Sequence, residues 1–233
     1  MEELPVLFKD DHYIAVDKPP GLFVHKSELD PKADHALRIV RAMSGGHVWP
    51  VHRLDRPTSG VLVFARTKDA TGRLSREFQE KRVTKIYHAV VRGYTVTEGL
   101  IDHDLAPEKG GTKGGTGKKS AVTAFTRLKT VELPYPVGRY QTARYSLVEA
   151  RPLTGRMHQI RRHFDHLFHP IIGDRVYGDG RQNKFIRDHF MIDRLLLSAR
   201  ELLFTHPYTG EPVHLIAPPD QEMDDLILRM FGK

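Results

Sequence analysis

Apolar and polar residues alternate in short blocks along this 233-residue chain, and most blocks have the length of a strand or a helix. Short apolar runs bounded by turn residues predict strands at 6–8, 13–16, 61–65, 121–128, 142–150, 195–197, 202–204 and 213–217. A change to a two-residue period predicts another strand over 83–94. Apolar residues at helical spacing predict helices at 34–43, 67–81 and 156–168, and from about residue 220 onward. The chain is therefore expected to combine strands with amphipathic helices.

Charged residues, turn residues and hydroxyls are concentrated in the stretch 52–60, HRLDRPTSG, immediately before the predicted strand at 61–65. Pro57 fixes its own φ angle and disfavours helix at the residue before it, so the stretch should form a turn held by a rigid strand. Arginines on both near sides favour the anionic form of Asp55. An anionic carboxylate in a fixed turn is a candidate nucleophile or general base. The alternative is an Asx turn or a surface ion pair.

Two further polar side chains fall in elements that are expected to be rigid. The apolar stripe of the helix at 156–168 also contains Arg161, and a buried guanidinium needs an anion nearby because an unpaired buried charge is costly. Asp55 is the natural candidate for that anion. In the strand at 83–94, the two-residue period makes Tyr87 project from a sheet. The alternative for Tyr87 is a core aromatic with its hydroxyl at the rim.

The composition is that of an ordinary globular protein, with 39% hydrophobic and 28% charged residues, and the net charge of +7 favours a polyanionic partner. The absence of cysteine excludes disulfides, thiolate catalysis and cysteine-based zinc sites. No H-E-x-x-H motif accompanies the 14 histidines, so we expect no metal, and no G-x-S-x-G motif supports a serine hydrolase. No apolar run approaches the roughly 18 residues of a membrane span, and the N-terminus lacks a signal-peptide pattern. A cytoplasmic protein is expected.

Two polar, basic segments are candidates for contacts with nucleic-acid phosphates. The segment 107–120 is rich in glycine and lysine, but it is not a phosphate-binding P-loop, because position 112 is Thr and position 119 is Lys. We expect its lysines to contact phosphates, with a solvated connector as the alternative. The segment 174–192 combines basic and aromatic residues and could follow an RNA strand, with an ordinary loop containing some helix as the alternative.

Four stretches of the chain together resemble the RluA-type pseudouridine synthases, enzymes that isomerise uridine in RNA. The stretch HRLDRPTSG resembles the catalytic motif of that family. The second and third family motifs are matched at 85–93 (KIYHAVVRG), at 154–161 (TGRMHQIR) and at 169–174 (HPIIGD). In order and spacing the resemblance extends from 16–19 to 205–207. One departure is Ser198, in Leu-Ser-Ala, where family members commonly have Leu-His-Ala.

The resemblance implies an α+β fold: a long, mixed, mainly antiparallel sheet with flanking helices and a central basic cleft. It implies that residues 1–233 form a single catalytic domain with no N-terminal RNA-binding module, and we expect a monomer. Neither a metal nor an organic cofactor is expected, because the isomerisation involves no net redox change and no added group.

The resemblance also implies roles for individual residues. Asp55 would be the catalytic carboxylate acting on a flipped-out nucleotide, and its attack at C1′, addition at C6 and removal of the C2′ proton remain open alternatives. Tyr87 would stack on the uracil, and Arg161 would keep Asp55 ionised and oriented. Arg53 would fill the space left by the flipped base. The residues expected to bind RNA are Arg53, Arg56, Lys118, Lys119, Arg156, Arg181 and Lys184.

The segment 177–183 and the lack of an N-terminal module resemble family members that act on uridine 65 of tRNA. A tRNA is therefore the expected partner. A uridine in ribosomal RNA is the alternative within the family, and a non-catalytic RNA-binding protein is the alternative outside it.

Overall fold

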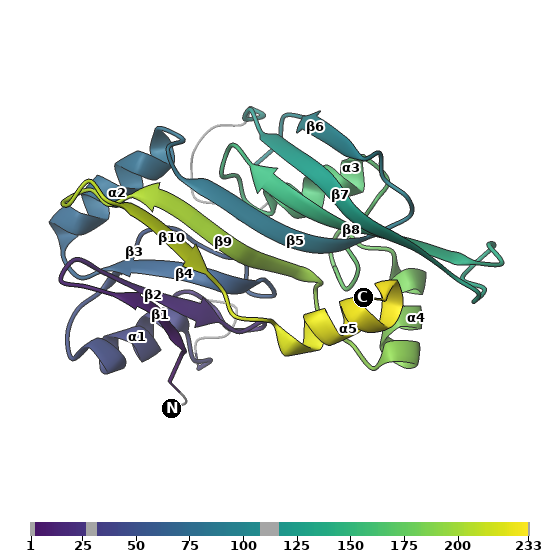
Figure 1. Cartoon of the computed structure of the whole chain (residues 1–233), viewed down its shortest axis with the longest axis horizontal. Helices are drawn as coiled ribbons and strands as arrows, with labels where there is room; N and C mark the ends of the chain where they lie inside the picture. Colours follow the sequence, from purple (N-terminus) through teal and green to yellow (C-terminus); the bar gives the residue numbers. More distant parts are fainter. Residues whose placement is uncertain (1–2, 27–31, 108–116, 233) are drawn as a thin grey trace. The chain divides into compact units, whose positions relative to one another are not determined.

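The structure is a computed structural model, and it describes residues 3–26, 32–107 and 117–232. The chain divides into two compact units (Figure 1). The first unit contains residues 1–85 and 198–220, and the second contains residues 86–197 and 221–233. Each unit is built around its own strands and is described by itself.

The strands of the first unit pair in the order β1, β2, β4, β9 and β10. Their bounds are β1 Val6–Lys9, β2 Tyr13–Lys18, β4 Ser59–Ala65, β9 Leu197–Thr205 and β10 Pro212–Ile216, and the short β3, Trp49–Pro50, also pairs with β4. The β4–β9 pair is parallel and the other pairs are antiparallel. Every residue of β4 is buried, as the uninterrupted apolar run at 61–65 predicts for a central strand covered on both faces.

Two helices complete the described part of the first unit: α1, Ala36–Ser44, and α2, Lys68–Gln79. Both begin where a side chain accepts a hydrogen bond from the first turn, from the backbone of Arg38 to His35 in α1 and from the backbone of Ala70 to Thr67 in α2. Ala70 and Leu74 of α2 are fully buried against the apolar cluster of β2 and β4. This packing confirms the amphipathic helix expected from the sequence.

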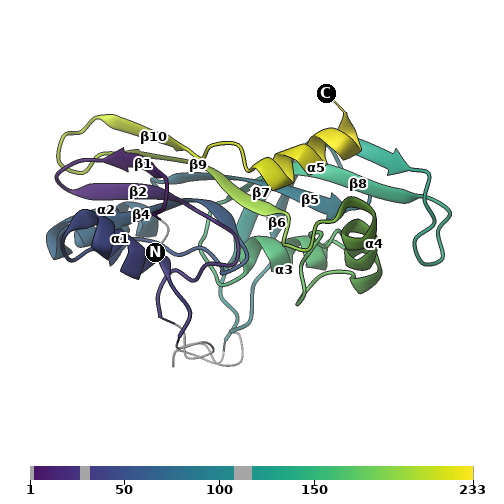
Figure 2. The ribbon, with the colours of Figure 1, turned by 90° about the horizontal axis from the view of Figure 1, so that it is seen from below.

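The strands of the second unit pair in the order β5, β8, β7 and β6, and the pairs are antiparallel. Their bounds are β5 Thr84–Arg92, β8 Ala143–Pro152, β7 Val122–Leu133 and β6 Glu98–Asp102. The helices are α3 Gln159–His166, α4 Gly180–Phe190 and α5 Gln221–Phe231. The α3 helix packs with Ala89 and Val91 of β5, and α5 packs with Val90, so these helices cover opposite faces of the sheet (Figure 2).

These elements confirm the α+β class: most of the strand pairs described above are antiparallel, and the β4–β9 pair is parallel. The structure corrects the expected loop at 174–192, because residues 180–190 form α4. That helix is capped by the carboxylate of Asp179, which accepts hydrogen bonds from the backbone of Arg181 and Gln182, and it ends at Met191 in the left-handed conformation. None of the helices within the described residues is long and apolar enough to cross a membrane.

Candidate active site

The turn that carries Asp55 is held through its main chain by a buried lysine. Lys18, at the end of β2, is fully buried, and its Nζ donates hydrogen bonds to the carbonyl oxygens of Pro19, Leu22 and Arg56 at 2.8, 2.9 and 3.1 Å. An ammonium group has three donor hydrogens, so three carbonyl acceptors satisfy it. Lys18 therefore ties the end of a strand and the loop that follows it to the residue after Asp55.

Further hydrogen bonds fix both sides of the same turn. The Nε of Arg56 donates to the carbonyl oxygen of Gly21 at 2.9 Å, and the backbone N–H of Gly21 donates to the carbonyl oxygen of Arg56 at 2.8 Å. The backbone N–H of Thr58 closes the turn by donating to the carbonyl oxygen of Asp55 at 3.1 Å. Asp55 itself is partly exposed. The turn thus presents a carboxylate on a main chain that other residues hold in place.

Gly60 marks the point where this turn enters β4. Its φ is +107°, and a Cβ atom there would lie 2.1 Å from the carbonyl oxygen of Ala199 on β9. Any side chain would clash with that backbone, so glycine is required at the position. The hydroxyl of Ser59, the preceding residue, donates to the carboxylate of Asp220 at 2.7 Å. These contacts fix the far end of the turn on β9 and the segment after β10.

His52, at the start of the motif, supports the turn and is held in its neutral form. Its Nε2 accepts a hydrogen bond from the backbone N–H of Val63 at 3.2 Å, and its ring stacks on Phe78 at 5.0 Å between centroids. Burial lowers the pKa of His52 to about 4, with a smaller contribution from the positive charge of Lys85. Burial likewise lowers the pKa of Lys85 to about 8. A neutral imidazole that accepts from the backbone has a structural role here.

Tyr87 lies in the second unit, on the face of the sheet that α3 covers. It is opposite Ala150 of β8, is partly buried, and packs against the apolar cluster that contains Ile160 and Phe164 of α3. The two-residue period of β5 is confirmed, because Ala89 belongs to this same cluster and its neighbour Val90 to the cluster on the other face. Tyr87 therefore shares a sheet face with the helix that carries Arg161.

The structure identifies Asp174 as the buried carboxylate that pairs with Arg161. The Nε and one terminal nitrogen of Arg161 donate to the two carboxylate oxygens at 2.7 and 2.9 Å, and the two side chains are 5% and 1% exposed. The expectation that a guanidinium in the apolar stripe needs a nearby carboxylate is confirmed, but the sequence pointed to Asp55 rather than Asp174. The pairing of Arg161 with Asp55, which lies in the first unit, stays a prediction.

Tyr177 and His158 adjoin this ion pair. The guanidinium carbon of Arg161 lies 5.1 Å from the centroid of the Tyr177 ring, and the Tyr177 hydroxyl is 3.0 Å from Nδ1 of His158. His158 is the N-cap residue immediately before α3, and its backbone is left-handed, with φ 55° and ψ 25°. Residues other than glycine rarely adopt that conformation, and they do so where surrounding contacts fix them.

The predicted RNA-binding residues lie in several places. In the first unit, Arg53 is exposed, whereas the guanidinium of Arg56 also lies 4.4 Å from the ring centroid of Phe23. In the second unit, Lys118 and Lys119 are exposed and adjoin Ser120, whose carbonyl oxygen accepts a hydrogen bond from exposed Arg156 at 3.0 Å. These three basic residues are brought together by the fold.

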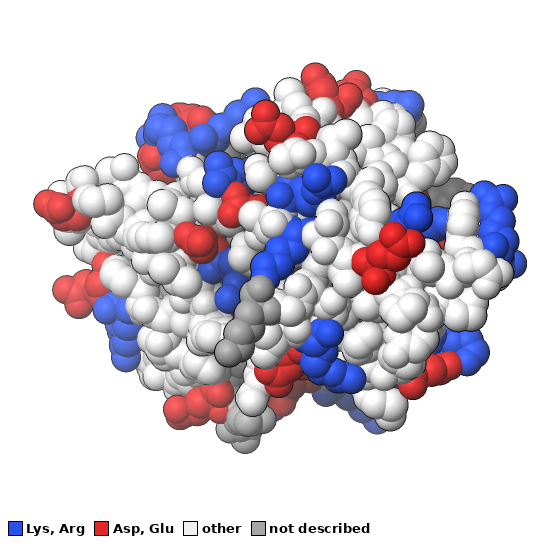
Figure 3. Space-filling model, turned by 45° about the vertical axis from the view of Figure 1, so that its right-hand side comes forward, with Lys and Arg blue, Asp and Glu red and all other residues white. Residues whose placement is uncertain are grey.

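The remaining two candidates, Arg181 and Lys184, are exposed residues of α4. The guanidinium of Arg181 packs close to Gly138, and Lys184 forms an ion pair with Asp188 one turn along the helix. In the face shown in Figure 3, lysine and arginine side chains are interspersed with aspartate and glutamate. The central basic cleft therefore stays a prediction, and so does the phosphate contact of each of these residues.

The histidines of α3 and its surroundings are mostly engaged with the protein itself. His163 is fully buried, with its ring nitrogens 2.9 Å from the hydroxyl oxygen of Thr123 and 3.1 Å from the carbonyl oxygen of His103. His169 is partly buried, with Nδ1 2.8 Å from the carbonyl oxygen of Arg92. Within the described residues, no group of three or more histidines or acids is arranged to hold a metal ion.

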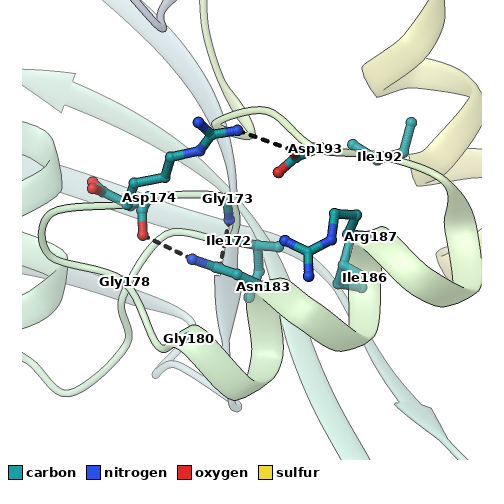
Figure 4. A pocket seen from close by; sticks show the side chains of 11 residues that line it. Ile172, Gly173, Asp174, Gly178, Gly180, Asn183, Ile186, Arg187, Ile192 and Asp193 are labelled. Atoms are coloured by element: carbon teal, nitrogen blue, oxygen red, sulfur yellow. Dashed lines mark hydrogen bonds and ion pairs between the residues drawn. The ribbon is translucent and has the colours of Figure 1, made fainter.

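A polar pocket of about 270 Å³ lies between the loop that contains Asp174 and the helix α4 (Figure 4). Asn183 of α4 forms part of its wall. The side-chain oxygen of Asn183 accepts from the backbone N–H of Gly173, and its nitrogen donates to the carbonyl oxygen of Asp174, both at 2.8 Å. At the rim, Arg175 pairs with Asp193 at 2.9 Å. The pocket backs onto the loop of the Arg161–Asp174 pair, and Asn183 braces that loop.

Three polar residues that the structure shows to be buried or partly buried were not selected from the sequence as site residues: Lys18 and Lys85 in the first unit, and Asp174 in the second. Lys18 stands two residues after the apolar run 13–16, where a lysine normally ends a strand at the surface. Lys85 lies on the same strand face as Tyr87, and this shared face is the sequence pattern that could have identified it. Asp174 lies at the end of the third family motif, but its distance of 13 residues from Arg161 does not suggest pairing.

A family model described as RNA pseudouridylate synthase matches residues 12–166, which is more than half of the chain. The chain belongs to this family and is an RNA pseudouridine synthase, an isomerase. Among similar proteins, the tRNA pseudouridine synthase C of Vibrio parahaemolyticus is 44% identical over 233 residues, covering 97% of this chain and 95% of that protein. The tRNA pseudouridine synthase C of Pasteurella multocida is 46% identical over 230 residues, covering 96% and 95%.

Solved structures show the same fold. Human RNA Pseudouridylate Synthase Domain Containing 1 is 28% identical, with a TM-score of 0.72, over 94% of this chain and 84% of that chain. Human RNA Pseudouridylate Synthase Domain Containing 4 has a TM-score of 0.73 at 22% identity, over 97% and 92%. The fold expected from the sequence motifs is thus confirmed by structures of the same family.

Proposed function

We propose that this enzyme isomerises uridine 65 of tRNA to pseudouridine and that Asp55 is its catalytic carboxylate. Near-full-length identity of 44–46% with proteins named tRNA pseudouridine synthase C carries the choice of tRNA over ribosomal RNA. The segment 177–183 supports position 65 by its resemblance to that group. We include in the proposal a single catalytic domain over 1–233, a monomer and a cytoplasmic location.

The chemistry requires a positioned carboxylate and an accessible base. The bond from N1 of uracil to C1′ of ribose must break, the base must turn, and C5 must join C1′. This exchange has no net redox change and adds no group, so its stoichiometry needs no cofactor. A uridine in folded RNA has to be flipped out of its stack before an enzyme can reach it.

The Asp55 turn suits this task because its main chain is fixed by Lys18, Arg56 and Thr58. A carboxylate on a fixed turn loses little conformational freedom when it meets a substrate, which favours reaction. Asp55 could attack C1′, add to C6 or remove the C2′ proton, and each of these steps uses the ionised form.

Two residues of the second unit and a set of basic residues complete the proposal. Tyr87 stacks on the flipped uracil, and Arg161 keeps Asp55 ionised and oriented. Arg53 occupies the space that the base leaves. Phosphates of the tRNA are contacted by the exposed basic residues Arg53, Arg56, Lys118, Lys119, Arg156, Arg181 and Lys184.

Replacing Asp55 tests the catalytic role. We expect Asp55→Asn to abolish pseudouridine formation in a tRNA transcript, while tRNA affinity in a filter-binding assay stays close to wild type, because phosphate contacts dominate binding. The matched control is Asp11→Asn, the same change at an exposed aspartate of the β1–β2 turn, which should keep full turnover. Wild-type turnover in Asp55→Asn would remove Asp55 from the mechanism.

The target position is tested separately with RNA. A tRNA transcript with cytidine at position 65 should receive no pseudouridine, whereas the parent transcript receives one at that position. Mapping of pseudouridine in total RNA from cells lacking the gene should show one lost tRNA site. Loss confined to ribosomal RNA would overturn the tRNA assignment and leave the enzyme class intact.

A further inference from the structure

Both carboxylate oxygens of Asp174 accept hydrogen bonds from residues of the second unit. One oxygen accepts from Nε of Arg161, and the other accepts from a terminal nitrogen of Arg161 and from the backbone N–H groups of Val176 and Tyr177 at 2.9 and 3.0 Å. The side chain is 1% exposed. Two parallel hydrogen bonds between a planar guanidinium and a carboxylate fix both the position and the plane of the arginine. Asp174 therefore joins the orientation of Arg161 to the shape of the turn at 174–178.

The backbone of this turn is also held by contacts that do not involve the carboxylate. A Cβ atom on Gly173 would lie 1.7 Å from the carbonyl oxygen of Arg194, and one on Gly178 would lie 2.0 Å from the carbonyl oxygen of Asp174. The amide of Asn183 bonds to the backbone of Gly173 and Asp174 on the other side (Figure 4). The turn thus has close backbone packing of its own, and the charge of Asp174 is directed to Arg161.

The same turn places an aromatic ring against the guanidinium. Tyr177 is one of the two residues whose backbone N–H groups bond to Asp174, and its ring lies 5.1 Å from the guanidinium carbon of Arg161. Its hydroxyl is 3.0 Å from Nδ1 of His158, whose left-handed backbone immediately precedes the helix that carries Arg161. Asp174 therefore fixes the plane of the Arg161 guanidinium, and the ring of Tyr177 packs beside it.

We propose that Asp174 is a positioning residue for pseudouridine formation, which acts by fixing the guanidinium of Arg161. The inference rests on the proposed function, in which Arg161 orients the catalytic carboxylate. Asp174 does not touch the substrate in this scheme. Its effect on the rate passes entirely through Arg161.

Asp174→Asn is the first test, because asparagine keeps an oxygen that can accept from Val176 and Tyr177 but loses the charge and the two-pronged pair with Arg161. Misplacing a group at a reacting centre costs up to about 100-fold in rate, so we expect a loss of about 10- to 100-fold in single-turnover rate with saturating enzyme. The affinity for tRNA should change by less than about threefold, because phosphate contacts dominate it. Asp193→Asn is the matched control: it makes the same change at an exposed carboxylate that pairs with Arg175 beside the same turn.

A double-mutant cycle separates positioning from a general structural effect. If Asp174 acts through Arg161, adding Asp174→Asn to Arg161→Met lowers the rate no further than Arg161→Met alone. If Asp174 only stabilises the fold, the two losses multiply, and the proposal is overturned. Arg161→Lys, which leaves a cation beside Asp174 but cannot form the two-pronged pair, is the second background should the Met variant be unfolded by circular dichroism.

The cycle also distinguishes failure of this inference from failure of the proposed function. A wild-type rate in Asp174→Asn together with a large loss in Arg161→Met or Arg161→Lys overturns the positioning role of Asp174 alone. A wild-type rate in the Arg161 variants removes Arg161 from the site and overturns both statements about it. The substrate assignment is tested by the position-65 transcript and does not depend on either result.

Discussion

The Asp55 turn and the Asp174 turn are built in opposite ways. Around Asp55, the hydrogen bonds that close the turn use main-chain carbonyls, which Lys18 and Thr58 hold. Around Asp174, the carboxylate itself accepts two backbone N–H groups and an arginine. The buried carboxylate of Asp174 therefore helps to build its own turn, whereas the main chain of the Asp55 turn is held by other residues. The difference separates a candidate catalytic acid from a positioning acid of the same residue type.

The largest expected effect on stability comes from removing the cation of the Asp174 turn. Arg161→Met leaves Asp174 as a buried carboxylate without its arginine, so we expect the free energy of unfolding in urea to fall by about 3–5 kcal/mol. Adding Asp174→Asn removes the uncompensated charge and should recover part of that loss. A loss below about 1 kcal/mol in the single variant, against the 3–5 expected, would show that the ion pair is not the element that holds this turn.

The corresponding change in the Asp55 turn is Lys18→Met. It removes the donor of three carbonyl groups, and buried acceptors left without a partner cost about 1–3 kcal/mol each before any relaxation, so we expect a loss of about 2–3 kcal/mol. Hydrogen exchange at the amides of Gly21 and Thr58 should accelerate, while the amide of Tyr177 stays protected. The control is Lys9→Met, an exposed lysine on β1. Equal acceleration in both turns would contradict their separate construction.

The third expected effect is a pH dependence that arises in the Asp55 turn. The pKa of His52 is lowered to about 4 in the folded protein, below the ordinary value of 6.5, so folding favours the neutral ring. The stability from this group is present above about pH 6.5 and is lost as the pH falls toward 4. His52→Gln keeps an acceptor for Val63 but does not titrate, so its unfolding free energy should fall less steeply between pH 6.5 and 4.5. Parallel curves for the two proteins would show that His52 is not the titrating group.

Much of the fold could be predicted from local patterns. The helix expected at 67–81 is α2, Lys68–Gln79, and it starts at Lys68 because Thr67 caps it. The two-residue period of β5 gave the correct faces for Ala89 and Val90. By contrast, the sequence of 174–192 indicates a loop and allows a helix only as part of the alternative, because Gly178, Gly180 and mixed charges obscure the apolar side of α4. These features depend on neighbours within one or two turns of chain.

The motif around Asp55 and the need of Arg161 for a buried anion were also visible in the sequence. Residue types and their spacing along a strand or helix are sufficient for such statements, because backbone preference and side-chain direction are local properties. Residue types and spacing identified the family and the candidate carboxylate Asp55. They did not identify the residues that contact Asp55 and Arg161.

The partners of the buried polar groups were decided by the tertiary structure alone. Asp174 reaches Arg161 across a turn, Lys18 reaches carbonyls of the segment that follows it and of Arg56, and His163 is buried between Thr123 and His103. Burial obliges each polar group to find a partner, but many residues of suitable chemistry are available along the chain. Packing of segments that are distant in sequence determines which of them meet, and no local pattern records that outcome.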